Sequence, residues 1–172
     1  MVVDKGGKVP QEVKIEYESD ITKIPDKAKV ILIKILNEAG ISSVKITSTI
    51  RSPADQARIM FDNLQQYGVE KQKQLYGNNG DLVIDEYENA KKEKKTEIEI
   101  KQKMEAKIKE LGPATVSKHC GDPAKISIFD IAPSSIPETN KSDFVKALKN
   151  SKDLSKYILP PTDPAYHLEI VL

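Results

Sequence analysis

The chain has 172 residues, enough to enclose one hydrophobic core of ordinary domain size. Hydrophobic residues make up 38% and charged residues 31%, and no apolar run reaches the roughly 20 residues of a membrane-spanning helix. Lys and Arg (27) balance Asp and Glu (26), so the net charge of +1 provides no general attraction for nucleic acid or an acidic membrane. We therefore expect a globular protein with no membrane span and no nucleic-acid partner, whose function depends on local sites.

The N-terminal residues 1–11 predict a flexible leader, and they lack the apolar core of a signal peptide. We expect a protein that is made in the cytoplasm and that reaches any target outside the cell through lysis or a dedicated export system. Cys120 is the only cysteine, which excludes an internal disulfide and a multi-cysteine zinc site. A metal site would need histidine and carboxylate ligands.

The first part of the chain alternates strand and helix patterns. Alternating apolar and polar residues over 12–18 predict an edge strand or an extended arm. Apolar residues at helical spacing over 25–39, followed by Gly40, predict an amphipathic core helix with a glycine cap. A β-branched alternation over 43–48 predicts a strand that delivers Arg51 to its end.

Helical patterns dominate the middle of the chain. A serine cap and a proline in the first turn predict a helix over 53–67. Residues 69–83 indicate a turn-rich loop, and residues 83–111 indicate one long, mostly solvated helix rich in lysine and glutamate. The thin apolar stripe of this helix consists of Ile98, Ile100, Met104 and Ile108. We expect 69–111 to be a charged helical insertion in a single domain of residues 1–172.

The last third predicts strands over 126–132 and 166–171, with a short helix between them that is capped by Asn140 or Ser142. Together with the strand near 43–49, these patterns predict an α+β fold. Its sheet is small, mostly antiparallel and covered by helices.

The chain has only two histidines, and each stands beside an apolar run. His119 lies in Ser-Lys-His-Cys-Gly and His167 in Tyr-His-Leu-Glu, while Asp130 interrupts the apolar strand between them. Two imidazoles and a carboxylate form the ligand set of a catalytic zinc site, which keeps a further position for water. Zinc would lower the pKa of bound water towards about 7 and polarise a carbonyl, so amide hydrolysis is the natural reaction.

Four motifs also occur in a characteristic order: Thr-Ser-Thr-Ile-Arg-Ser, Ser-Lys-His-Cys-Gly, Phe-Asp-Ile and Tyr-His-Leu-Glu. In these motifs the chain resembles the zinc peptidases of the D-alanyl-D-alanine carboxypeptidase and L-alanyl-D-glutamate endopeptidase family, which has the hedgehog/DD-peptidase fold. The resemblance covers roughly Lys45 to Leu172. It implies a hydrolase that cuts bacterial peptidoglycan peptides, as cell-wall-degrading carboxypeptidases and phage endolysins do, with Zn²⁺ as the cofactor.

The resemblance also implies roles for individual residues. The three implied zinc ligands are His119, Asp130 and His167. Ser117 matches a serine at the substrate pocket. Tyr166, which stands where the family usually has a tryptophan beside its last histidine, is the second expected substrate-binding residue. Arg51 matches an arginine that faces the substrate carbonyl, where a fixed guanidinium would stabilise the developing oxyanion.

Two assignments within this site stay open. The family places its acidic general base shortly before the last histidine, which favours Asp163, but Glu169 shares a strand face with His167 and competes for that role. In addition, the segment 122–125 lengthens the usual spacing between the first histidine and the aspartate. If this segment loops out as a turn, His119 and Asp130 can meet one metal ion together with His167, but Asp122 then becomes a rival ligand. If it does not loop out, the enzyme interpretation fails.

Two other functions remain possible from the residues. A catalytically inactive relative would use the same fold to bind cell-wall peptide or a protein partner. Alternatively, Cys120 with His167 and an acid would suit a thiol peptidase, although we favour a buried structural cysteine.

Overall fold

The computed structural model describes residues 11–172, so the predicted leader lies outside the described residues except for its last residue. Within this range the chain forms seven α-helices and a five-stranded mixed sheet that is mostly antiparallel. The predicted α+β class is confirmed. The chain divides into two compact units: the residues up to Thr49 together with Lys125–Leu172 form the sheet unit, and Ile50–Ala124 form the helical unit. The single domain with an insertion stays a prediction.

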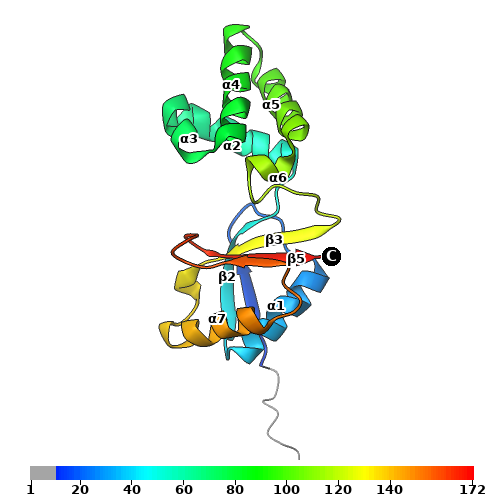
Figure 1. The fold of residues 1–172 in the computed structure, drawn as a ribbon, viewed down its shortest axis with the longest axis vertical. Helices are drawn as coiled ribbons and strands as arrows, with labels where there is room; N and C mark the ends of the chain where they lie inside the picture. The colour runs from blue at the N-terminus through cyan, green and yellow to red at the C-terminus, as the bar shows by residue number, and fades with distance from the viewer. Residues whose placement is uncertain (1–10) are drawn as a thin grey trace, which may run out of the picture. The chain divides into compact units, whose positions relative to one another are not determined.

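The sheet unit contains every strand of the described residues (Figure 1). In sheet order the strands are β1 (Lys14–Tyr17), β2 (Ser43–Thr49), β3 (Ile126–Ile131), β5 (Tyr166–Val171) and β4 (Lys156–Ile158). β1 runs parallel to β2, and all other neighbours are antiparallel. The sequence patterns predict four of these strands. β4 has only three residues, too few for an alternation to be recognised.

Two helices, α1 (Asp26–Glu38) and α7 (Lys141–Asn150), cover one face of this sheet (Figure 1). Short 3₁₀ turns at Pro133–Ser135 and Glu138–Asn140 lead from β3 to α7. The shared core includes Leu32, Leu36, Ile46, Phe129, Ile131, Phe144, Leu148, Leu168 and Ile170. Because side chains alternate along a strand, burial of these residues turns the intervening side chains of β3 and β5 to the opposite face.

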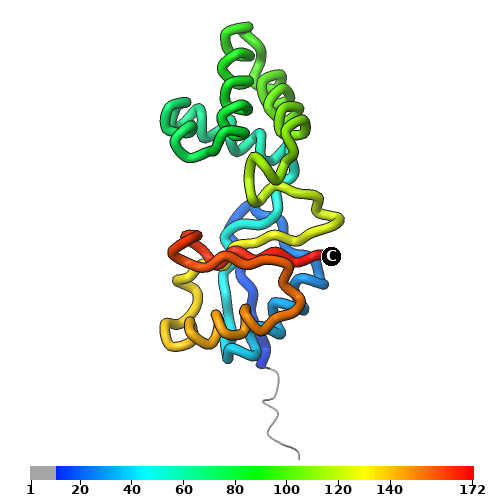
Figure 2. Tube along the Cα trace, viewed as in Figure 1, coloured from blue at the N-terminus to red at the C-terminus, as the bar shows by residue number. Residues whose placement is uncertain are grey.

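The helical unit consists of consecutive helices, which can be followed along the chain in Figure 2. They are α2 (Pro53–Tyr67), α3 (Val69–Leu75), α4 (Asn78–Lys92), α5 (Glu97–Leu111) and α6 (Pro113–Val116). The start of α2 is as predicted, because the Ser52 hydroxyl accepts a hydrogen bond from the N–H of Asp55 at 3.1 Å.

Two predictions for the helical unit are wrong: the loop over 69–83 and the single helix over 83–111. Most of the supposed loop is helical, and the supposed long helix breaks after α4, where Lys94 has a φ of 55°. α5 then starts with a capping box, in which Thr96 and Glu99 satisfy each other's backbone N–H groups. No glycine or proline marks this break, so the Thr-x-x-Glu pattern was the only local signal for it.

The helical unit has a hydrophobic core of its own, so α4 and α5 are not the mostly solvated helix that the sequence suggests. Its buried residues include Ala57, Met60, Phe61, Leu64, Val83, Ile84, Tyr87, Ala90, Ile100, Met104 and Ile108. Each helix contributes a narrow stripe, and the stripes pack against one another. No helix in the described part of the chain is long and apolar enough to cross a membrane.

This core predicts very different costs for two substitutions on α5. Met104→Ala should lower the free energy of unfolding by about 2–5 kcal/mol, because Met104 is fully buried and its loss leaves a cavity. Ile98→Ala is the matched control, because Ile98 is 69% exposed and should change stability by less than about 0.5 kcal/mol. Urea denaturation measures both. Equal, small effects would show that α5 has no core behind it.

Candidate metal centre

The pairing of β3 with β5 brings two of the predicted ligands together. Asp130 and His167 are direct partners in this antiparallel register and therefore project from the same face of the sheet. Nδ1 of His167 lies 2.9 Å from Oδ1 of Asp130, which is hydrogen-bond distance. Residues far apart in sequence thus meet because of strand register, on the face opposite α1 and α7.

The other ring nitrogen of His167 has a carboxylate partner as well. Nε2 lies 2.9 Å from Oε1 of Glu169, two residues further along the same strand face. Burial by itself lowers the pKa of His167, but the hydrogen bonds and charges of Asp130 and Glu169 outweigh it and raise the pKa above its ordinary value. The two carboxylates therefore favour the protonated form of the ring, which competes with metal binding.

His119 lies in the turn that follows α6, and its backbone is paired with the residue after β2. The N–H of Arg51 donates to the carbonyl of His119 at 2.6 Å, and the N–H of Gly121 donates to the carbonyl of Arg51 at 3.3 Å. Arg51 and Cys120 form an isolated parallel β-bridge. The first predicted ligand and the predicted oxyanion-stabilising arginine are therefore connected through their backbones.

His119, Asp130 and His167 form a buried group that could hold a metal ion. Each of them offers one ligand atom, and these atoms all lie within 4.8 Å of one another. Two imidazole nitrogens and one carboxylate oxygen match the donor types that transition metals such as zinc take in proteins. The carboxylate of Glu169 can hold the remaining ring nitrogen of His167, as partners of metal-bound histidines commonly do.

Comparison of the chain with protein-family models, with curated proteins and with solved structures gives no match.

The segment 122–125 forms a turn, as the site requires. Asp122 is exposed, and its Oδ1 accepts a hydrogen bond from the N–H of Ala124 at 3.0 Å. A side chain that closes a local turn in this way is a common role for aspartate. The group that could hold an ion contains Asp130 and not Asp122.

The two candidates for the general base have different surroundings. Asp163 is buried, and its Oδ1 accepts a hydrogen bond from the N–H of Ala165 at 3.0 Å in the approach to β5. Glu169 contacts His167 directly, so it orients the ring. The alternation His-Leu-Glu, which places both polar side chains on one strand face, already indicated that these two residues are neighbours. The role of Asp163 as a base stays a prediction.

The predicted substrate-binding residues both have structural contacts. The hydroxyl of Ser117 accepts a hydrogen bond from the N–H of His119 at 3.3 Å and so supports the turn that carries this ligand. Tyr166 is buried and packs edge-to-face against Phe144 of α7, on the sheet face opposite His167. Their roles in substrate binding stay predictions.

Cys120 has the properties of a structural residue. Its side chain is fully buried, and burial raises the pKa of the thiol to about 11, although the nearby Arg51 opposes this shift. A thiol nucleophile needs a lowered pKa to be reactive near neutral pH. These surroundings argue against a thiol peptidase.

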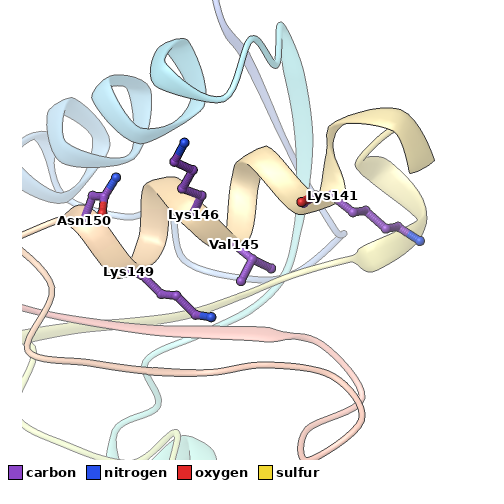
Figure 3. A pocket seen from close by; sticks show the side chains of 6 residues that line it. Lys141, Val145, Lys146, Lys149 and Asn150 are labelled. Atoms are coloured by element: carbon purple, nitrogen blue, oxygen red, sulfur yellow. The ribbon is translucent and has the colours of Figure 1, made fainter.

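An open pocket of about 490 Å³ lies along α7 and contains none of the predicted ligands. Its lining consists of Lys141, Ser142, Val145, Lys146, Lys149 and Asn150. Figure 3 shows the amino groups of Lys141, Lys146 and Lys149 pointing in different directions. These charges do not converge on one point, so the pocket lacks the arrangement of an anion site.

Alkylation tests the state of Cys120. Iodoacetamide at pH 8 should modify the folded protein about 100-fold or more slowly than the urea-unfolded chain, because a thiol with a pKa of about 11 has far less thiolate than one near 8.5. Mass spectrometry over time gives both rates. Equal rates would show that the thiol is accessible and ionised in the folded protein. That result would support the thiol peptidase hypothesis again.

Metal titration tests the ligand group. We expect one Zn²⁺ or Co²⁺ per chain by calorimetry, with binding lost in His167→Ala and Asp130→Asn. Glu169→Gln should weaken binding about 10- to 100-fold, because it removes a carboxylate that orients a ligand. Asp122→Asn is the matched control and should bind as the wild type does. Loss of binding in Asp122→Asn alone would instead assign Asp122 as the ligand.

Proposed function

We propose that this protein is a zinc-dependent peptidase that hydrolyses a peptide bond in bacterial cell-wall peptidoglycan, on a fold of the hedgehog/DD-peptidase type. The observation that supports it most is the buried group of His119, Asp130 and His167, a donor set typical of catalytic zinc sites. The order of the four sequence motifs supports the substrate class through the resemblance to peptidoglycan peptidases.

In this proposal each residue of the site has a separate role in the reaction. Zinc, when bound, supplies Lewis acidity, which activates water and polarises the scissile carbonyl. Arg51 stabilises the negative charge that develops on the carbonyl oxygen, and Asp163 accepts a proton. Ser117 contacts the peptide, whereas Tyr166 packs in the core behind the sheet. The protein acts on the wall after lysis or export, as an endolysin does.

One observation favours a second function. Both ring nitrogens of His167 already have carboxylate partners, so this buried polar network is satisfied without an ion. A catalytically inactive relative would keep such a network for stability and would use the same fold to bind cell-wall peptide or a protein partner.

Digestion of purified peptidoglycan separates the two functions. The zinc-loaded protein should release new amino termini or free amino acids, identified by mass spectrometry, and a chelator should abolish the release until Zn²⁺ is restored. His119→Ala should reduce turnover about 100-fold or more, because it removes a predicted ligand. Stoichiometric zinc without turnover would contradict the peptidase and leave the binding function. Release that a chelator does not affect would contradict both.

A further inference from the structure

Arg51 is held by a chain of side-chain hydrogen bonds inside the helical unit. Its Nη1 donates to Oε1 of Gln56 at 3.3 Å, and Nε2 of Gln56 donates to the hydroxyl of Tyr76 at 3.3 Å. Gln56 lies in the first turns of α2 and is fully buried. Leaving a buried amide without hydrogen bonds costs free energy. Gln56 therefore restricts the positions of both of its partners, Arg51 and Tyr76.

Tyr76 is itself fixed in place by α4. It follows the last residue of α3, and its ring rests on Gly80. A Cβ atom at Gly80 would lie only 2.8 Å from Cγ of the tyrosine, so no larger residue fits beneath the ring. Burial raises the pKa of Tyr76, although Gln56 and Arg51 oppose this, so the hydroxyl stays neutral near pH 7.

We propose that Gln56 and Tyr76 are positioning residues for Arg51. This inference rests on the proposed function, in which the guanidinium of Arg51 faces the substrate carbonyl. An arginine side chain has many rotamers, and a hydrogen bond to a buried, fixed amide restricts them. Catalytic groups have to be held within about 0.5 Å of their working position, which supporting residues achieve through packing and hydrogen bonds.

The inference gives the segment 69–111 a role in the site. The sequence suggests a charged insertion apart from the chemistry, but Tyr76 and Gly80 both belong to it. Through Gln56, this segment fixes the direction of a side chain from the end of β2. We therefore expect changes at Tyr76 and Gly80 to alter Arg51 while leaving metal binding unchanged.

The arginine side chains provide a direct test by NMR. The sequence has only two arginines, so a ¹⁵N-labelled sample gives two Nε–Hε signals, and Arg58, which is exposed and pairs with Asp62, is an internal reference. Tyr76→Phe removes only the hydroxyl and should lower the order parameter of Arg51 Nε while leaving that of Arg58 unchanged. Tyr67→Phe, at an exposed tyrosine of the same unit, is the matched control.

Variants of Gln56 and Gly80 extend the test. Gln56→Met keeps the approximate size but removes the acceptor and should free Arg51, whereas Gln56→Glu keeps an acceptor and should restore its order. Gly80→Ala should displace the Tyr76 ring and reproduce the effect of Tyr76→Phe. If Gln56→Met fails to fold, the single-atom change in Tyr76→Phe still decides the outcome.

Kinetics give the second readout. In the zinc-loaded protein, Gln56→Met should lower kcat by up to about 100-fold with KM nearly unchanged, since misplacing a catalytic group by about 1 Å costs this much. Gln56→Glu should recover most of the loss, and zinc content should equal that of the wild type throughout. If Gln56 had only a structural role, its substitution would lower stability but would not lower kcat selectively at an unchanged KM.

The two proposals fail in different ways. An Arg51 signal that stays unchanged in both Tyr76→Phe and Gln56→Met overturns the positioning role, whatever the peptidase assay shows. A wild-type protein without turnover, in which Arg51 still responds to these substitutions, supports the positioning of Arg51 and overturns the peptidase. An equal loss of order at Arg58 would indicate general loosening and also overturn the positioning role.

Discussion

The register between β3 and β5 is the constraint on which the rest of the candidate site depends. Phe129 and Leu168 are buried against α1 and α7, and this burial fixes which residues of the two strands face each other. A slip of one residue would turn the polar side chains into the apolar core, where they would lack partners. Hydrophobic packing on one face of the sheet therefore sets the geometry of Asp130 and His167 on the other face.

In the group of Asp130, His167 and Glu169, the cost of burying a charged imidazole is offset by its two carboxylate partners. An imidazole that is removed from water loses much of the solvation of its charged form, but the carboxylates of Asp130 and Glu169 compensate for this loss. A proton and a metal ion thus compete for the same ring. A cation of either kind stabilises the carboxylates of Asp130 and Glu169, because removing the positive charge would leave two neighbouring negative charges uncompensated. The pairing is compatible with a metal centre and also with a purely structural network.

The strands and helices of the sheet unit could largely be predicted from sequence, because alternation and caps are local signals. Apolar alternation predicts β3 and β5. The aspartate at position 130 marks a polar position on the otherwise buried strand β3. The break between α4 and α5 has one local signal, the capping box of Thr96 and Glu99. The core of the helical unit has none, because each helix carries only a narrow apolar stripe. Contacts such as Gln56 with Tyr76 depend on how separate helices pack, and no spacing in the sequence encodes them.

The bridge between Arg51 and Cys120 also bears on the order in which the chain folds. β2 and β3 are neighbours in the sheet, although the whole helical unit lies between them in sequence. Closing a long disordered loop costs conformational entropy that grows with the number of residues in it. The bridge between Arg51 and Cys120 joins residues near the two ends of the helical unit, so a helical unit that folds first closes most of this loop before the two strands pair. Early formation of the helices would then lower the entropic cost of the least local pairing of the sheet.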